Sequence, residues 1–280
     1  MSLPPLDIPF LLKHAGLRAK KGLGQNFLRD ENALKKIVEI AGVHPSDEVL
    51  EIGAGLGSLT RHLARSARKV YAIEIDGSMI PLLEAVLSGF KNVEIIQGDI
   101  LMIQPTDLGL AHDFLVVANI PYYITSAIIR HLLSGEIKPR RIVLTVQEEV
   151  GERICATPGK MNLLALSVQV FGHPQITYKI PSQAFTPEPD VDSCVIAIDM
   201  HPHPLIEEKK LDTFFKLAKT AFSQKRKTLR NSLAGASGLS TAETPALLAG
   251  ASIDPIRRAE TLTLDEWGKL TEQYILLEKK

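Results

Sequence analysis

The stretch of sequence that decides the fold is Glu51-Ile-Gly-Ala-Gly-Leu-Gly57, which ends one apolar run and precedes a helical pattern from about Ser58. Glycines in such a loop let backbone amides approach a ligand, and the start of a helix adds a partial positive charge. Glu74 ends the next apolar run, 21 positions after Gly53, where a carboxylate can accept both hydroxyls of a ribose. We therefore expect a nucleoside-containing cofactor here, the alternative being a tight turn without a ligand.

The register of the glycines argues against a dinucleotide. Gly53 and Gly55 fit the first two positions of the GxGxxG fingerprint, but its third position is Ser58 and the remaining glycine is Gly57. This spacing favours a different nucleoside ligand. An NAD-dependent dehydrogenase stays an alternative, because Gly53 to Glu74 alone would fit one.

Short β-branched runs alternate with longer helical patterns, which is typical of βαβ units around a mostly parallel sheet. A helical pattern at 26–41, with Asp30 as a candidate N-cap, precedes the first run. The last two runs have no helix between them, so we expect an antiparallel hairpin at one edge of the sheet. The predicted strands are 48–52, 69–75, 93–97, 114–118, 141–146, 176–180 and 194–198.

The composition changes after Met200. The sequence HPHP at 201–204 predicts a linker, because each proline restricts the residue before it to extended geometry. Helical patterns follow at 207–222, 225–234, 242–250 and 264–278. We therefore expect an α/β domain over residues 1–200 and a small all-α domain over residues 205–280.

Composition excludes several classes. The 280 residues are 45% hydrophobic and 23% charged, as in globular proteins, and Cys155 and Cys194 have no partner spacing for a disulfide framework or a zinc site. The eight histidines also lack ligand spacing, so we expect no metal. Prolines break the N-terminal stretch and no apolar run reaches the roughly 18 residues of a membrane span. We expect a cytoplasmic protein without membrane contact.

Polar residues follow two further predicted strands. Asp99 comes after the third and can accept a hydrogen bond from an adenine amino group, the alternative being a capping aspartate. Asn119-Ile-Pro-Tyr122 follows the fourth. The carboxyl ends of parallel strands form the ligand crevice of such sheets. There an amide oxygen and a neighbouring carbonyl can accept both protons of an exocyclic amine while an aromatic ring stacks on the base.

Lysine and arginine (32) balance aspartate and glutamate (32), so any attraction to a polyanion must come from local clusters. Three such clusters occur, at 18–21, 138–141 and 225–230. Charge runs are usually solvated faces, and the middle cluster is equally well explained that way. The third, with Lys225, Arg226, Lys227 and Arg230, opens the helical domain and is the one that we expect to bind phosphates.

The chain resembles the small-subunit (16S) ribosomal RNA adenine N6,N6-dimethyltransferases, which use S-adenosylmethionine to dimethylate two adjacent adenines near the 3′ end of that RNA. The resemblance covers nearly the whole chain, and its last two motifs are more specific than the glycine loop. The motifs are GQNFL (24–28), EIGAGLG (51–57), EID (74–76), GDI (98–100), NIPY (119–122), FTPEPDVDS (185–193) and KRKTLRNSL (225–233). The family usually has Leu in place of Ile120, a change that keeps the backbone carbonyl. It also has a different lead into KTLRN than Ser223-Gln224-Lys225-Arg226, which bears on the basic side chains that touch RNA.

The resemblance implies a Rossmann-like class I methyltransferase domain, a role in ribosome biogenesis, and a substrate within an immature ribosomal subunit, and we expect a monomer. Two aromatic rings, Tyr122 and Phe185, are candidates to sandwich an unstacked adenine, although Phe185 also fits ordinary core packing. The implied cofactor contacts are Asn26, Leu28, Gly53, Glu74, Asp99 and Asn119, and the implied catalytic residues are Asn119, Ile120, Pro121, Tyr122 and Phe185.

Two alternatives share parts of this pattern. A resistance-type methyltransferase acting on large-subunit ribosomal RNA has a similar glycine loop, but usually reads SQNF at its start, so Gly24 and the KTLRN motif argue against it. A non-catalytic ribosome-assembly factor on the same scaffold is the other alternative. The intact set of cofactor residues favours an active methyltransferase over this alternative.

Overall fold

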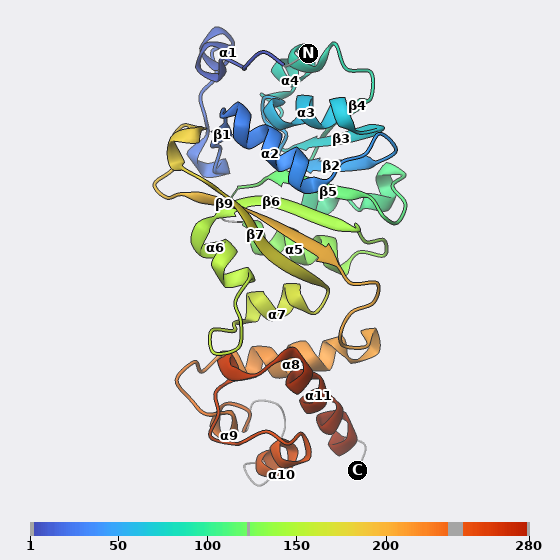
Figure 1. Ribbon diagram of the computed structural model, residues 1–280, viewed down its shortest axis with the longest axis vertical. Helices are drawn as coiled ribbons and strands as arrows, with labels where there is room; N and C mark the ends of the chain where they lie inside the picture. Colours follow the sequence, from blue (N-terminus) through green and yellow to red (C-terminus); the bar gives the residue numbers. More distant parts are fainter. Residues whose placement is uncertain (1–2, 122–123, 235–242, 279–280) are drawn as a thin grey trace. The chain divides into compact units, whose positions relative to one another are not determined.

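The computed structural model describes residues 3–121, 124–234 and 243–278. The chain forms two compact units (Figure 1). The first consists of the residues up to Gly151 together with Pro174–Met200, and the second of Glu152–His173 together with the residues from His201 onward. Residues Glu152–His173, which the sequence division places in the first domain, therefore cluster with the C-terminal helices.

The first unit is built on a seven-stranded sheet of order β4-β3-β2-β5-β6-β9-β7. Its first five strands are parallel, whereas β9 runs antiparallel to β6 and lies beside the edge strand β7. The expected mostly parallel sheet with an antiparallel edge is thereby confirmed. The strands are β2 (Glu48–Ile52), β3 (Lys69–Glu74), β4 (Val93–Gln97), β5 (Leu115–Asn119), β6 (Arg141–Gln147), β7 (Gly172–Ile180) and β9 (Ser193–Met200).

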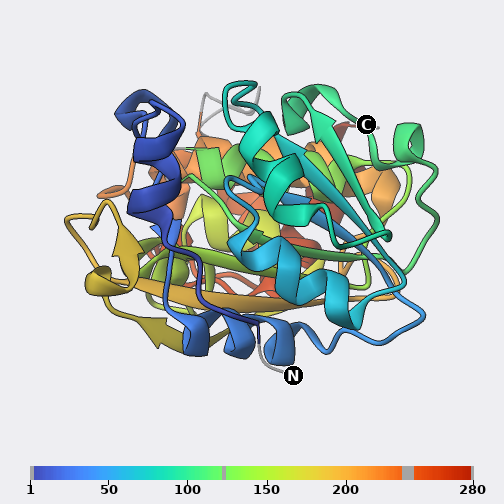
Figure 2. The same ribbon diagram turned by 90° about the horizontal axis from the view of Figure 1, so that it is seen from above.

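The helix before the sheet begins later than its hydrophobic pattern suggests. Asp30 caps α2 (Glu31–Ala41) by accepting the Ala33 amide at 2.7 Å, as expected. Phe27–Leu28, inside the predicted helical stretch, instead form the short strand β1, which pairs antiparallel with β8 (Phe185–Thr186). The blue N-terminal segment consequently lies beside the gold segment at the left of Figures 1 and 2. Pairing across more than 150 residues has overridden the local helical pattern.

Helices connect the parallel strands of the first unit. α2 and α3 (Ser58–Ser66) contact each other and share one apolar cluster with the buried faces of β2, β3, β5, β6 and β9. This burial on a continuous core fixes where each parallel strand ends, and so places the loops after those strands at one edge of the sheet. The other helices are α1 (Ile8–His14), α4 (Ile80–Leu87), α5 (Thr125–Ser134) and α6 (Glu148–Ile154), the last running into the second unit.

The second unit is helical, with α7 (Leu163–Gln169), α8 (Leu211–Phe222), α9 (Leu229–Ser232), α10 (Glu243–Gly250) and α11 (Leu264–Glu278). Fully buried Trp267 packs edge-on against Phe214 and stacks on Phe222, which joins α8 to α11. The prediction of a helix over 225–234 is correct only for α9. Residues 223–226 form a turn and Lys227 a bend, because three consecutive cations supply no apolar face. Within the described ranges, no helix is long and apolar enough to cross a bilayer.

Candidate functional site

The first unit contains a cavity at the carboxyl ends of the parallel strands, with an empty volume of about 1000 Å³ that includes solvent at its mouth. Six residues expected to bind cofactor line it together, although they come from five separate segments of the chain: Asn26, Leu28, Gly53, Glu74, Asp99 and Asn119. Ile120 and Pro121 line the same cavity. The loops after β2, β3, β4 and β5 therefore converge where the sequence placed a ligand.

Backbone conformation explains the glycines of the loop after β2. Gly53 and Gly55 have φ values of +76° and +57°, which side chains rarely tolerate. A Cβ on Gly55 would lie 3.0 Å from the Phe27 ring, and one on Gly53 would lie 3.5 Å from the Asn119 carbonyl oxygen. The loop thus needs glycine at both positions for its turn, and at Gly55 also for its close approach to the Phe27 ring.

The Glu74 carboxylate is buried at the end of β3 and fixes the loop beside it. Its Oε2 accepts the Gly55 amide at 2.7 Å and its Oε1 accepts the Asp76 amide at 2.8 Å. Burial raises the pKa of Glu74, although these backbone hydrogen bonds act in the opposite direction. Each oxygen keeps acceptor capacity beyond its one backbone bond, so the carboxylate can still receive hydroxyl donors.

Glu51 is a second carboxyl group in the cavity wall, and the sequence reasoning gave it no role. It is 1% exposed, and no described group donates to its Oε2. Burial raises the pKa of Glu51 to about 8, and the neighbouring Glu74 carboxylate acts in the same direction. At neutral pH this side chain is therefore held mainly as the neutral acid. The sequence signal for this residue is a carboxyl group within a predicted buried strand, directly before the glycine loop.

Asp99 performs the capping function that was its alternative interpretation. Its Oδ1 accepts the Leu101 amide at 2.9 Å and so begins the short 3-10 helix η2 (Ile100–Met102). The residue also lines the cavity, so capping and ligand contact use the same position. One bond to Oδ1 leaves Oδ2 for another donor.

The amide of Asn119 has a fixed orientation at the end of β5. Its Nδ2 donates to the Asn26 carbonyl at 3.1 Å, which turns Oδ1 away from that carbonyl. Ile120 is 2% exposed and lines the same cavity. Tyr122, the expected stacking ring, lies outside the described residues. The arrangement provides a directed amide oxygen beside a backbone carbonyl, the pattern that an exocyclic amine requires.

Phe185, expected to sandwich an adenine together with Tyr122, is not among the residues that line the cavity. Its side chain is 2% exposed and packs in the main apolar cluster of the first unit, which includes Leu28 and Ile180. Phe185 pairs with Leu28 across β1 and β8, and this pairing directs the ring into the core. Core packing, the alternative interpretation of this residue, describes the position observed. A stacking role stays a prediction that would require the ring to leave the core.

An apolar contact was also missed by the sequence reasoning. Ile75, which follows Glu74, lines the cavity and is 50% exposed although it is a large apolar side chain. Ile100, on the neighbouring loop, lines it as well. Exposed apolar surface inside a concave site is characteristic of a place where a flat ligand binds.

Comparison with known proteins agrees with this geometry. The family model described as ribosomal RNA adenine dimethylase matches residues 16–272. The chain is 44% identical to ribosomal RNA small subunit methyltransferase A of Dehalococcoides mccartyi (strain CBDB1), over 92% of this chain and 89% of that protein. It is 41% identical to the protein of the same name in Moorella thermoacetica, over 93% and 94% of the two chains.

The chain belongs to the ribosomal RNA adenine dimethylase family. Two solved structures are similar to it in fold. A dimethyladenosine transferase from Plasmodium falciparum matches with a TM-score of 0.77 and 26% identity, over 89% of this chain and 98% of that one. The 23S rRNA methyltransferase ErmE matches with a TM-score of 0.72 and 28% identity, over 89% and 99%. Family membership identifies an enzyme that uses S-adenosylmethionine and excludes the dehydrogenase alternative.

The dimethylase has three basic clusters with different structural surroundings. In the middle cluster, Arg140 pairs with Asp47 at 2.7 Å and Arg141 with Asp199 at 2.5 Å. These two arginines are structural. The cluster at 225–230 differs, because Lys225, Arg226, Lys227 and Arg230 are exposed and no carboxylate among the described residues pairs with them.

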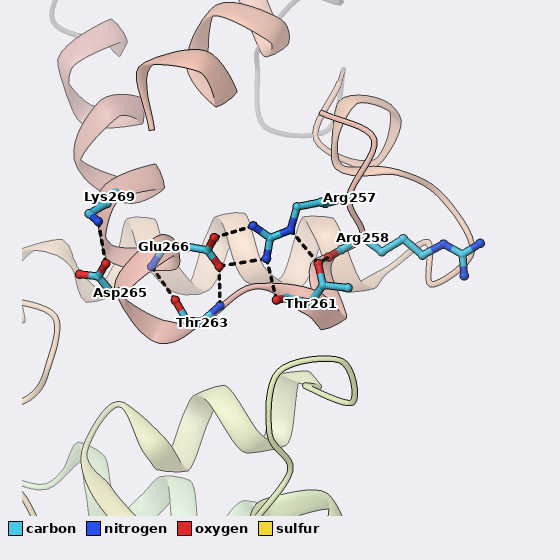
Figure 3. Close-up of polar contacts among 7 residues, drawn as sticks. All are labelled: Arg257, Arg258, Thr261, Thr263, Asp265, Glu266 and Lys269. Carbon is cyan, nitrogen blue, oxygen red and sulfur yellow. Dashed lines mark hydrogen bonds and ion pairs between the residues drawn. The ribbon is translucent and has the colours of Figure 1, made fainter. Parts of the chain in front are cut away.

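The fold brings a further arginine to that third cluster. The Leu229 amide donates to the Arg257 carbonyl at 2.7 Å, and the Arg230 amide donates to the Pro255 carbonyl at 3.1 Å. Figure 3 shows that Arg257 is turned toward Glu266 and Thr261, whereas Arg258 extends away from them. We call Lys225, Arg226, Lys227, Arg230 and Arg258 the basic surface. Arg258 could not be assigned to this surface from local sequence, because its position depends on these long-range backbone bonds.

Proposed function

We propose that the dimethylase transfers methyl groups from S-adenosylmethionine to N6 of two adjacent adenines near the 3′ end of small-subunit ribosomal RNA. The observation that carries this proposal is the convergence of the six cofactor residues and the Asn119-Ile120 turn on one cavity. The relatives named small subunit methyltransferase A, at 41 to 44% identity, favour the small subunit over the large one.

The chemistry of the cavity suits S-adenosylmethionine. We assign the ribose to Glu74, the adenine to Asp99 and to the apolar faces of Ile75 and Ile100, and the methionine end to the glycine loop and Asn26. A Cβ at Gly53 or Gly55 would narrow this space, which supports a ligand held close to the backbone. When bound, the cofactor supplies a methyl group on a positively charged sulfonium.

The residues at the end of β5 would act on the acceptor nitrogen. The lone pair of adenine N6 is delocalised into the purine ring, so the amine is a poor nucleophile. Hydrogen bonds donated by the two N–H groups of N6 to Asn119 Oδ1 and the Ile120 carbonyl favour a pyramidal nitrogen with a localised lone pair. Pro121 restricts the turn that holds these acceptors, and Tyr122 is the candidate to stack on the extruded base. Positioning of N6 against the methyl group then lowers the entropic barrier to transfer, and no general base is needed before the attack.

The basic surface is our candidate for RNA backbone contact in the second unit. Its five cations are exposed, and they would release condensed counterions on binding phosphates, which makes the affinity dependent on salt. Such contacts set orientation, whereas selection of the base belongs to the cavity. We further propose that the enzyme acts as a monomer in the cytoplasm on an immature small ribosomal subunit.

The decisive experiment is transfer of a labelled methyl group. Purified protein is incubated with methyl-labelled S-adenosylmethionine and small subunits that lack the modification, and the labelled nucleotides are located by primer extension and nuclease digestion. We expect label in two adjacent N6,N6-dimethyladenines. The Asn119→Ala variant serves as a control for contaminating activity.

The outcomes separate the alternatives. Label in large-subunit RNA would favour a resistance-type methyltransferase. Binding to the subunit without transfer of label would favour a non-catalytic assembly factor. Either result would contradict the proposed function.

A further inference from the structure

The N-terminal part of the chain forms one wall of the cavity. We call residues 17–28 the N-terminal strap, because its end, from Leu23 to Leu28, lines the cavity ahead of the first helix of the α/β pattern. Phe27 anchors it from inside, in a small apolar cluster with Leu56 of the glycine loop and Met79. The strap supplies two of the expected cofactor contacts, Asn26 and Leu28, without belonging to the seven-stranded sheet.

A single carboxylate ties the strap to the loop after β3. Asp76 Oδ1 accepts the Lys20 ammonium at 2.7 Å, and Oδ2 accepts the Gln25 side-chain amide at 3.0 Å. The Gln25 Oε1 in turn accepts the Lys20 backbone amide at 2.8 Å. Lys20, Gln25 and Asp76 thereby form a closed ring of hydrogen bonds, which we call the clasp.

The clasp is connected to the opposite wall. The Asp76 backbone amide donates to Glu74 Oε1 at 2.8 Å, and Glu74 Oε2 accepts the Gly55 amide at 2.7 Å. A continuous chain of hydrogen bonds therefore runs from the glycine loop, through the carboxylate assigned to the ribose, to the strap. Movement of the strap would therefore be transmitted to Glu74 through the hydrogen bonds of Asp76.

The two halves of the clasp differ in their exposure to solvent. The Asp76 side chain is 3% exposed, whereas that of Lys20 is 49% exposed. Although burial acts to raise it, hydrogen bonds from Lys20, Ser78 and Gln25 hold the pKa of Asp76 at about 2. The carboxylate thus stays charged and needs donors, while Lys20 can exchange its bond for water. The buried carboxylate is held by several donors, whereas the ammonium is accessible to solvent.

We propose that Asp76 is a positioning residue that fastens the N-terminal strap over the cofactor cavity, and that release of Lys20 and Gln25 opens the route by which the nucleoside cofactor enters and leaves. The proposal rests on the proposed function in one respect, the identity of the ligand. It assigns no chemical step to these three residues. Their effect is on the rates of binding and release.

The test compares two lysines that make ion pairs of equal length. Lys20→Met removes the ion pair of the clasp and leaves the bond of Gln25 to Asp76, whereas Lys69→Met removes the 2.7 Å pair of Lys69 with Glu94, whose residues do not line the cavity. Dissociation of labelled S-adenosylmethionine from the full-length protein is followed by rapid filtration after a chase with unlabelled cofactor. We expect release roughly 10-fold faster for Lys20→Met, the effect of one charge-assisted hydrogen bond. Lys69→Met and Lys20→Arg should match the wild type.

Hydrogen exchange provides a readout that needs no ligand. Amides of residues 17–28 should exchange faster in Lys20→Met than in Lys69→Met, because the strap loses its fastening. Equal release rates, or equal exchange in the strap, for the two methionine variants would overturn the proposal. A wild-type protein that retains no labelled cofactor would instead contradict the proposed function, and the exchange measurement would still decide the clasp.

Discussion

The cavity of the first unit and the basic surface of the second recognise their ligands in different physical ways. In the cavity, Glu74 and Asn119 have orientations fixed by backbone hydrogen bonds of 2.7 to 3.1 Å, and both are buried or partly buried. On the basic surface, the cations are exposed, and no carboxylate of the described residues orients them. Preorganised contacts should therefore change chemistry and specificity when removed, whereas exposed charges should change affinity in a manner that depends on salt.

The largest expected effect is that of Asn119→Ala on the methylation rate. We expect single-turnover methylation with saturating cofactor and RNA to slow about 100- to 1000-fold, as on loss of one preorganised contact to a developing charge. RNA affinity should change far less. Asn92→Ala removes an asparagine amide that also donates to backbone carbonyls, at 2.8 and 3.0 Å, outside the cavity. If the two variants were equally active, Asn119 would shape the turn without taking part in the reaction.

Glu74→Ala tests the cofactor side of the cavity. We expect S-adenosylmethionine to bind about 10- to 100-fold more weakly by calorimetry, since the ribose loses a charge-assisted acceptor worth roughly 1.5 to 3 kcal/mol. Glu48→Ala, at the other end of the neighbouring strand β2, is the control and should bind normally. Unchanged affinity in Glu74→Ala would remove this carboxylate from the site.

Glu51→Gln tests the buried carboxyl group of the cavity wall through the pH dependence of the unfolding free energy. The pKa of Glu51 is raised from 4.5 to about 8 in the folded state, so between these values the folded protein keeps a proton that the unfolded chain releases. This contribution to stability is present below pH 4.5 and is lost as the pH rises toward 8, at about 1.4 kcal/mol per pH unit. Glutamine cannot ionise, so the unfolding free energy of the variant, measured with urea from pH 5 to 8, should fall less steeply. Parallel curves would show that Glu51 is ionised in the folded protein.

The smallest effect is expected on the basic surface. Arg258→Gln should weaken RNA binding about 8-fold at 0.1 M salt and reduce the slope of log affinity against log salt by about one, the signature of one phosphate contact. Neighbouring Arg257, which donates to Glu266 and Thr261, is the matched control. Arg257→Gln should lower the melting temperature and leave the salt slope unchanged. Equal slopes of log affinity against log salt in both variants would show that Arg258 is an ordinary solvated side chain without a phosphate contact.

Features determined by local sequence could be predicted. The parallel strands follow from β-branched runs between helical patterns, the Asp30 cap from its place before an amphipathic stretch, and the glycine loop from its spacing. The expected cofactor residues that follow β2, β3, β4 and β5 line one cavity because loops after parallel strands meet at one edge, and their contact with a cofactor stays a prediction. The orientation of Phe185 could not be predicted, since an aromatic residue at the start of a motif gives no sign of which way its ring points.

The remainder depends on contacts between distant segments. The pairing of β1 with β8 and the bonds of Lys20 and Gln25 to Asp76 join residues more than 50 positions apart. Arg258 reaches the basic surface only because Leu229 and Arg230 bond to the segment at 255–257. Single-sequence patterns carry no information on such pairs, because neither partner has a distinctive local spacing.

The path of the chain between the two units has a consequence for inheritance. The chain crosses between them after Gly151, His173 and Met200, and α7, encoded in the middle of the gene, packs on α8 from its last third. A fragment ending at residue 200 would keep α7 and its buried Leu166 without that partner. Recombination that exchanged gene tails at this point would also join an α7 to an α8 that it had not evolved with. The C-terminal helices should therefore pass between genomes together with the 152–173 segment rather than as an interchangeable tail.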